Sequence, residues 1–65
     1  MTFDDLTWEA KGCCGEYQVA AVPVSDGVMH LTKTEGGARV VVIRDGMMVR
    51  DMGELTEAEC AALLP

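Results

Sequence analysis

Long apolar runs are missing from this chain of 65 residues. The longest, Val19 to Val24 and Val40 to Ile43, are far shorter than the roughly 20 residues that a membrane-spanning helix needs. Glycine (7 residues) and proline (2 residues) are too few for a low-complexity linker, and a hydrophobic fraction of 49% excludes intrinsic disorder. We therefore expect one small globular domain that spans residues 1–65 and has no membrane partner.

Basic residues are scarce as well. Five Lys and Arg residues against eleven Asp and Glu residues leave a formal net charge of −6 and an isoelectric point near 4.4. This balance excludes the basic footprint of direct nucleic-acid binding and disfavours anionic membrane surfaces. A partner attracted by the charge would present a basic surface, and many basic surfaces are nucleic-acid sites. The alternative is an acidic surface that only keeps the domain in solution.

Groups for targeting, catalysis or metal binding are also few. The acidic start lacks the basic region of a secretory signal peptide, so we expect a cytoplasmic protein. Three cysteines, an odd number, argue against a disulfide framework.

Cys13, Cys14, Cys60 and His30 make a formal Cys3His set, but adjacent cysteines do not match the spacing of zinc sites. One histidine and one serine, Ser25 in a turn signature, provide no activated nucleophile. We expect no enzyme, no metal and no cofactor.

What the chain does have is β-strand patterning. Apolar and polar residues alternate in the first segment, and β-branched segments separated by glycine-containing turns follow it. The predicted strands cover residues 6–11, 17–22, 28–34, 39–44 and 47–52. A helix over residues 3–10 is the alternative for the first segment, and the strand is favoured because a helix would place Trp8 on its polar side. Pro23 cannot donate to a strand ladder, so it marks an edge or a bulge.

The dipeptide Asp45-Gly46 predicts a tight hairpin, because both turn positions need a positive φ. A two-residue turn there fixes the register of the flanking strands. It pairs Ile43 with Met48, Val42 with Val49, and Val41 with Arg50.

The end of the chain predicts a helix. Thr56 is its N-cap, Glu59 completes a capping box, and Leu55 packs against Cys60. Cys60, Leu63 and Leu64 form an apolar stripe on this helix of about eight residues, which is too short to persist unless it docks on the sheet. The predicted fold class is α+β: an antiparallel β-meander of four or five strands with one short C-terminal helix packed on one face.

One short helix covers one face of such a sheet and leaves the other uncovered. The hairpin register places four apolar residues on one face with an arginine at either border: Val41, Ile43, Met48 and Met52, between Arg39 and Arg50. An apolar patch with a polar rim is typical of contact with another chain, most simply in a two-fold homodimer. The alternative is that the N-terminal segment, with Phe3, packs over this face.

The carboxylates divide between the two ends of the meander, because successive turns alternate ends. Asp26 and Asp45 are predicted at one end. The denser group is predicted near the other end, beside the helix start, and comprises Glu35, Asp51, Glu54 and Glu57, with Glu16 next to it. Helix capping and turn formation explain several of these acids locally, but the second group is denser than those roles require.

Two segments carry a resemblance to a known class. The opening Leu6-Thr7-Trp8-Glu9 and the closing Gly53-Glu54-Leu55-Thr56-Glu57-Ala58-Glu59 with Leu63-Leu64, joined by glycine-punctuated strands, resemble small acidic phage-encoded accessory proteins over most of the chain. Within that group the chain most resembles the anti-CRISPR proteins.

The resemblance implies a non-enzymatic, stoichiometric inhibitor that binds a Cas effector complex and presents carboxylates where the effector expects phosphates. We therefore expect a basic protein surface to be contacted by Glu35, Asp51, Glu54 and Glu57, with Asp26 and Asp45 as a second group. The alternative is a small structural or assembly module that homodimerises through the apolar sheet face.

Overall fold

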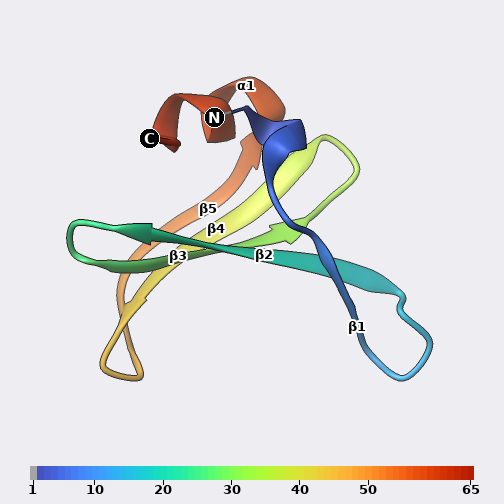
Figure 1. Ribbon diagram of the computed structural model, residues 1–65, viewed down its shortest axis with the longest axis horizontal. Helices are drawn as coiled ribbons and strands as arrows, with labels where there is room; N and C mark the ends of the chain where they lie inside the picture. The colour runs from blue at the N-terminus through green and yellow to red at the C-terminus, as the bar shows by residue number, and fades with distance from the viewer. Residues whose placement is uncertain (1) are drawn as a thin grey trace.

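The computed structural model describes residues 2–65 and has the predicted α+β fold, a five-stranded antiparallel sheet with one C-terminal helix. The strands follow one another in the order β1-β2-β3-β4-β5, so the β-meander is confirmed. The elements are a 3-10 helix η1 (Phe3–Asp5), β1 (Glu9–Lys11), β2 (Tyr17–Val24), β3 (Gly27–Lys33), β4 (Gly37–Arg44), β5 (Met47–Thr56) and α1 (Glu57–Leu63). Figure 1 shows a strongly twisted sheet, with α1 and η1 lying together over one of its faces.

The N-terminal segment combines both alternatives considered for it. One turn of 3-10 helix forms first, and only residues 9–11 of the predicted strand pair with β2. The carboxylate of Asp5 accepts a hydrogen bond from the backbone N–H of Thr2 at 2.9 Å, which closes the turn. The rings of Phe3 and Trp8 then lie 5.2 Å apart, centroid to centroid. This aromatic contact holds the extended link between η1 and β1 against the core.

The core lies on the sheet face that α1 and η1 cover, here called the covered face; the opposite one is the open face. Alternate residues of β2, β3 and β4 point into the core, as the two-residue period of a strand requires. The buried apolar residues are Phe3, Leu6, Ala20, Val22, Met29, Leu31, Ala38, Val40, Val42 and Cys60. Because Phe3 belongs to this set, the N-terminal segment packs on the covered face, and the alternative that it shields the open face is wrong.

The register between β4 and β5 differs from the prediction after its first pair. Ile43 pairs with Met48 as expected, but Val42 pairs with Arg50 and Val41 with Asp51. The hairpin turn itself forms, with positive φ at Asp45 (54°) and Gly46 (79°). Two irregularities follow it, and they leave Val49 and Met52 without a partner on β4. Each adds one residue to β5, which a simple two-residue turn could not predict.

These bulges change which β5 side chains share a face. Met52 packs against the core, so its predicted place on the uncovered apolar face is wrong. Arg50 pairs with the buried Val42 and therefore belongs to the covered side, not to the border of the open face. Asp51 takes its place beside Val41 on the open face. One extra residue moves the following side chains to the opposite face because the strand period is two.

The C-terminal helix begins where the sequence predicts. The Thr56 hydroxyl accepts a hydrogen bond from the Glu59 N–H at 3.1 Å, and the Glu59 carboxylate accepts one from the Thr56 N–H at 2.9 Å. Cys60 is fully buried beneath the helix, and Leu64 is partly buried against the core. Leu63 is exposed, so only part of the predicted stripe faces the sheet. No helix within residues 2–65 is long and apolar enough to cross a membrane.

Pro23 lies inside β2, which runs two residues beyond its predicted end. It pairs with Val28 on β3, whereas β1 pairs only with residues 17–19 of β2. The outer edge of β2 is therefore unpaired at Pro23, the position in a sheet where a proline is tolerated.

Candidate functional site

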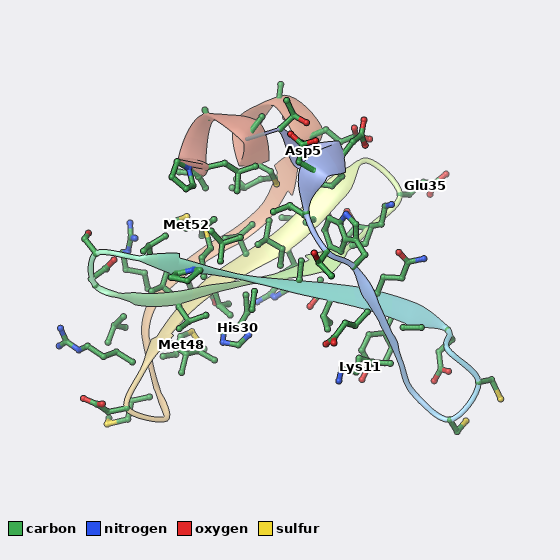
Figure 2. All side chains as sticks on the ribbon, viewed as in Figure 1. Asp5, Lys11, His30, Glu35, Met48 and Met52 are labelled. Carbon is green, nitrogen blue, oxygen red and sulfur yellow. The ribbon has the colours of Figure 1, made fainter. Side chains whose placement is uncertain are left out.

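Three of the six predicted partner-binding carboxylates gather at one place, here called the acidic end: Glu35, Glu54 and Glu57. The register between β4 and β5 brings them together, because Gly37 pairs with Thr56 and thereby sets the turn before β4 beside the junction of β5 and α1. Glu35 and Glu54 line one shallow depression, which Thr34, Gly36, Leu55 and Thr56 complete. Figure 2 shows Glu35 at the outer side of the β3–β4 turn, pointing away from the sheet.

The carboxylates of the acidic end are free to bind a partner. All three side chains are exposed, and none makes a hydrogen bond or an ion pair with any residue in the range 2–65. No basic residue lines the depression that holds Glu35 and Glu54. The β3–β4 turn, the end of β5 and the helix start thus carry three carboxylates without an ion pair, although Arg39, which is paired with Asp51, lies opposite Glu54 on β4.

Two other predicted carboxylates are engaged within the fold. Asp26 accepts a hydrogen bond from Arg50 Nη2 at 3.0 Å and forms an ion pair with Arg50 Nε at 2.9 Å. Asp51 lies 3.4 Å from Arg39 Nη2 and accepts a hydrogen bond from the Gly53 N–H at 3.0 Å. Gly53 has a positive φ of 70°, so Asp51 holds the second bulge of β5. Their charges are compensated locally, which makes them poor ligands for a basic partner.

The last predicted carboxylate, Asp45, is exposed in the β4–β5 turn. Its turn and that of Asp26 connect strands at the same end of the meander, but Figure 1 shows the twist of the sheet spreading the two turns apart. Asp45 therefore lies apart from the acidic end, at the opposite end of β5 from Glu54.

Three further acids form local hydrogen bonds instead of joining a cluster. Glu16, predicted beside the acidic end, folds back on the β1–β2 turn and accepts a hydrogen bond from the Cys14 N–H at 3.0 Å. Hydrogen bonds from its own backbone and from Cys14 lower the pKa of Glu16. Hydrogen bonds from Thr2 likewise lower the pKa of Asp5, and those from Thr56 lower the pKa of Glu59. Local capping thus accounts for these carboxylates.

The open face carries a second candidate surface. Val28, Ile43 and Met48 lie in one row across β3, β4 and β5, and Val41 occupies the next row. Val28 (36% exposed) and Met48 (58% exposed) are open to solvent. The ion pair of Arg39 with Asp51 lies beside this strip, on the same face. The predicted apolar patch therefore forms from Val41, Ile43 and Met48, without Met52.

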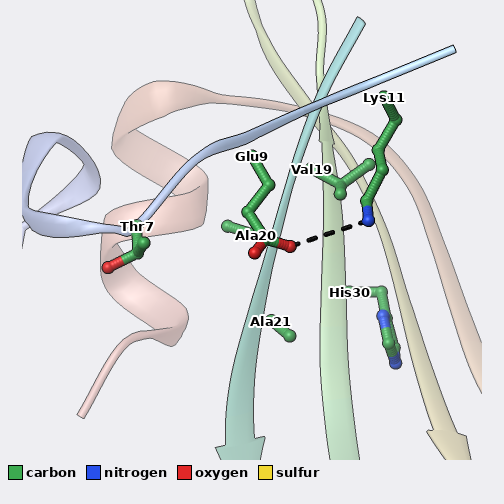
Figure 3. Close-up of a pocket in the computed structure, with 7 residues that line it drawn as sticks. All are labelled: Thr7, Glu9, Lys11, Val19, Ala20, Ala21 and His30. Atoms are coloured by element: carbon green, nitrogen blue, oxygen red, sulfur yellow. Dashed lines mark ion pairs between the residues drawn. The ribbon is translucent and has the colours of Figure 1, made fainter. Parts of the chain in front are cut away.

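A hollow on the open face was not foreseen from the sequence. It lies between β1 and β3 and is lined by Thr7, Glu9, Lys11, Val19, Ala20, Ala21 and His30 (Figure 3). Glu9 and Lys11 form an ion pair at 3.8 Å across its rim, with both side chains more than half exposed. Exposed ion pairs of this kind stabilise a fold by about 0–1 kcal/mol, so this pair contributes little to fixing the rim of the hollow. The only hint in the sequence is that Thr7, Glu9 and Lys11 alternate on one side of a strand.

The four residues of the formal zinc set lie in three different places. Cys13 and Cys14 are exposed in the β1–β2 turn, Cys60 is buried in the core, and His30 lies on the open face. Burial raises the pKa of the Cys60 thiol. Within residues 2–65 no group of three or more His, Cys, Asp or Glu side chains is placed to hold a metal ion.

Comparison with known proteins gives no guide to this site. No family model, no curated protein and no solved structure matches the chain. The fold defines a small single-sheet α+β domain, and its function has to be inferred from its two exposed surfaces.

Proposed function

We propose that this chain is a non-enzymatic inhibitory binding protein that uses its acidic end to occupy a basic surface of a protein partner. The observation that carries the proposal is that Glu35 and Glu54, from a turn and a strand, line the same depression, and neither forms an ion pair within residues 2–65. Glu57 extends the charge onto the helix start. A net charge of −6 favours the same kind of partner.

The resemblance to anti-CRISPR proteins supports a Cas effector complex as that partner. Cas effectors hold nucleic acid in positively charged channels, which are the basic surfaces that such an acidic domain would enter. Long-range attraction between the two charges would speed association, and salt would weaken it. Because Glu54 and the β3–β4 turn are fixed by backbone pairing, the carboxylates lose little freedom when they bind.

Two variants with the same loss of charge test this proposal. Glu35→Gln with Glu54→Gln removes two carboxylates from the acidic end, whereas Glu9→Gln with Asp45→Asn removes two carboxylates elsewhere. Asparagine tolerates the positive φ of residue 45, so the control keeps its turn. Binding of each protein to immobilised, purified Cas effector complexes of several types is measured by surface plasmon resonance.

The acidic-end variant is expected to raise the Kd by about two- to thirtyfold, since exposed ion pairs contribute about 0.2–1 kcal/mol each. The control should change the Kd less than about twofold, because its carboxylates lie outside the contact. An equal increase in Kd for both variants would show that binding depends on overall charge and not on the acidic end. Absence of binding to every effector at low salt would refute the choice of partner.

The second candidate function is a structural module that homodimerises through the open face. The row formed by Val28, Ile43 and Met48 favours it, because apolar side chains in one strip lie open to solvent. Light scattering across micromolar concentrations tests it. A mass of two chains that Met48→Glu reduces to one chain would support this function, and a mass of one chain throughout would exclude it.

A further inference from the structure

The β1–β2 turn presents two thiols side by side. Cys13 and Cys14 are both exposed, and their Sγ atoms lie 3.6 Å apart. Figure 1 shows this turn extending away from the body of the sheet, remote from α1 and from the acidic end. Neither cysteine contributes to the core, so nothing in the packing of the fold accounts for the pair.

The turn holds the two thiols in place through its flanking residues. Gly12 and Gly15 both have positive φ, 90° and 68°, and the Gly15 N–H donates to the Gly12 carbonyl at 3.4 Å. The Glu16 carboxylate lies over Gly12, where a Cβ would collide with it, and accepts a hydrogen bond from the Cys14 N–H. Glu16 could rotate away from a side chain on residue 12, but the positive φ of Gly12 would strain such a side chain and therefore favours glycine there.

The separation of the sulfur atoms suits one bridging atom better than a direct bond between them. Consecutive Cα atoms lie about 3.8 Å apart, below the usual range of about 4.4–6.8 Å for disulfides, so a direct bond would strain the turn. An atom bonded to both sulfurs at about 2.3 Å, the length of a zinc–sulfur bond, would span 3.6 Å with an angle near 100°. Such an angle suits a pyramidal or tetrahedral centre.

The number of ligand side chains near the turn distinguishes a tetrahedral metal centre from a pyramidal centre. A tetrahedral zinc ion would need further protein ligands, and the described part of the chain offers no group of three ligand side chains. A pyramidal centre that already carries a third substituent needs only two ligands from the protein, which the two thiols provide. Trivalent arsenic bearing one organic group has this valence, and it is soft enough to prefer sulfur.

We propose that Cys13 and Cys14 form a bidentate binding site for monosubstituted trivalent arsenicals. The reaction exchanges ligands without a change of oxidation state: R–As(OH)2 and two thiols give R–As(S–Cys)2 and two molecules of water. Two As–S bonds form, two As–O bonds break, and each departing hydroxide takes up one thiol proton. This site is separate from the acidic end and does not depend on the proposed inhibitory function.

Phenylarsine oxide is the probe, and intact-protein mass spectrometry of the full chain under reducing conditions is the readout. We expect one phenylarsenic group per chain, retained in excess glutathione, a monothiol, and removed by the dithiol 2,3-dimercaptopropanol. An adduct that persists in excess monothiol indicates chelation by two thiols. A single As–S bond exchanges readily, whereas in a chelate the second bond holds the arsenic in place until the first re-forms.

Three serine variants assign the site. Cys13→Ser and Cys14→Ser should each abolish the glutathione-resistant adduct, whereas Cys60→Ser should retain it because Cys60 is buried. Circular dichroism of each variant shows whether the sheet is intact, and both turn variants should keep it since their side chains are exposed. A glutathione-resistant adduct that survives in either turn variant, or that requires Cys60, overturns the proposal. A mass lowered by two hydrogens without an adduct would show that the sulfurs pair directly, and would overturn it as well.

Discussion

Replacing Gly37 by alanine tests the contact that assembles the acidic end. Gly37 is buried at the start of β4 and pairs with Thr56 at the end of β5. A Cβ on Gly37 would lie 2.7 Å from the Thr56 carbonyl carbon and 2.8 Å from its Cα, and closer still to the Leu55 carbonyl oxygen. These are backbone atoms of β5, so they cannot rotate away as a flexible side chain would.

The expected loss of stability is about 1–3 kcal/mol or more, the usual effect of forcing an extra carbon into a packed site. A domain of 65 residues has a total stability of about 3–10 kcal/mol, so the loss is a large fraction of it. It should lower the Tm by about 4–8 °C for each kcal/mol. The separation of β5 from β4 would also carry Glu54 away from Glu35.

Gly36 provides a matched control one residue away. A Cβ there meets nothing within 4 Å, so Gly36→Ala should be neutral or stabilising by up to about 1 kcal/mol. Urea unfolding followed by circular dichroism compares the two variants with the original chain. Equal midpoints for the two alanine variants would refute the close approach of β4 to β5, and with it the assembly of the acidic end.

Two further predictions concern the helix start. Thr56→Ala should cost about 1 kcal/mol in urea unfolding, because the Glu59 N–H loses the hydroxyl that caps it. Glu59 makes the helix sensitive to acid. Hydrogen bonds from Thr56 lower the pKa of Glu59 below its ordinary value of 4.5, so the stabilisation that the Glu59 carboxylate contributes is present above pH 4.5. The effect is lost as the pH falls through the lowered pKa. The stability difference between the original chain and Glu59→Gln should therefore shrink below about pH 4.5; a difference that stays constant to pH 2 would contradict this linkage.

The succession of strands and the helix start could be predicted from the sequence, because local chemistry decides both. Asp45-Gly46 enforces positive φ at two positions, and Thr56 with Glu59 forms a reciprocal cap; both appear in the structure as expected. Met29 and Leu31 share the buried face of β3, as the two-residue period of a strand requires.

The bulges of β5 could not be predicted, because they depend on contacts across the sheet. Asp51 turns toward Arg39 on β4 and toward the Gly53 N–H, and this combination stabilises an extra residue in the strand. Counting from the hairpin turn misses that residue and so misplaces Met52. The same limit applies to the carboxylates: sequence spacing brought Glu35 close to Glu54, but it could not reveal that Arg50 compensates Asp26.

Competition with nucleic acid tests the central proposal most directly. A complex of this chain with a Cas effector is formed on a surface, and single-stranded or guide-paired DNA is titrated against it. If the carboxylates of Glu35, Glu54 and Glu57 occupy the basic channel, DNA should displace the chain, and the bound chain should exclude DNA in return. A ternary complex, in which the effector holds DNA and the chain together with unchanged affinity for each, would contradict that account.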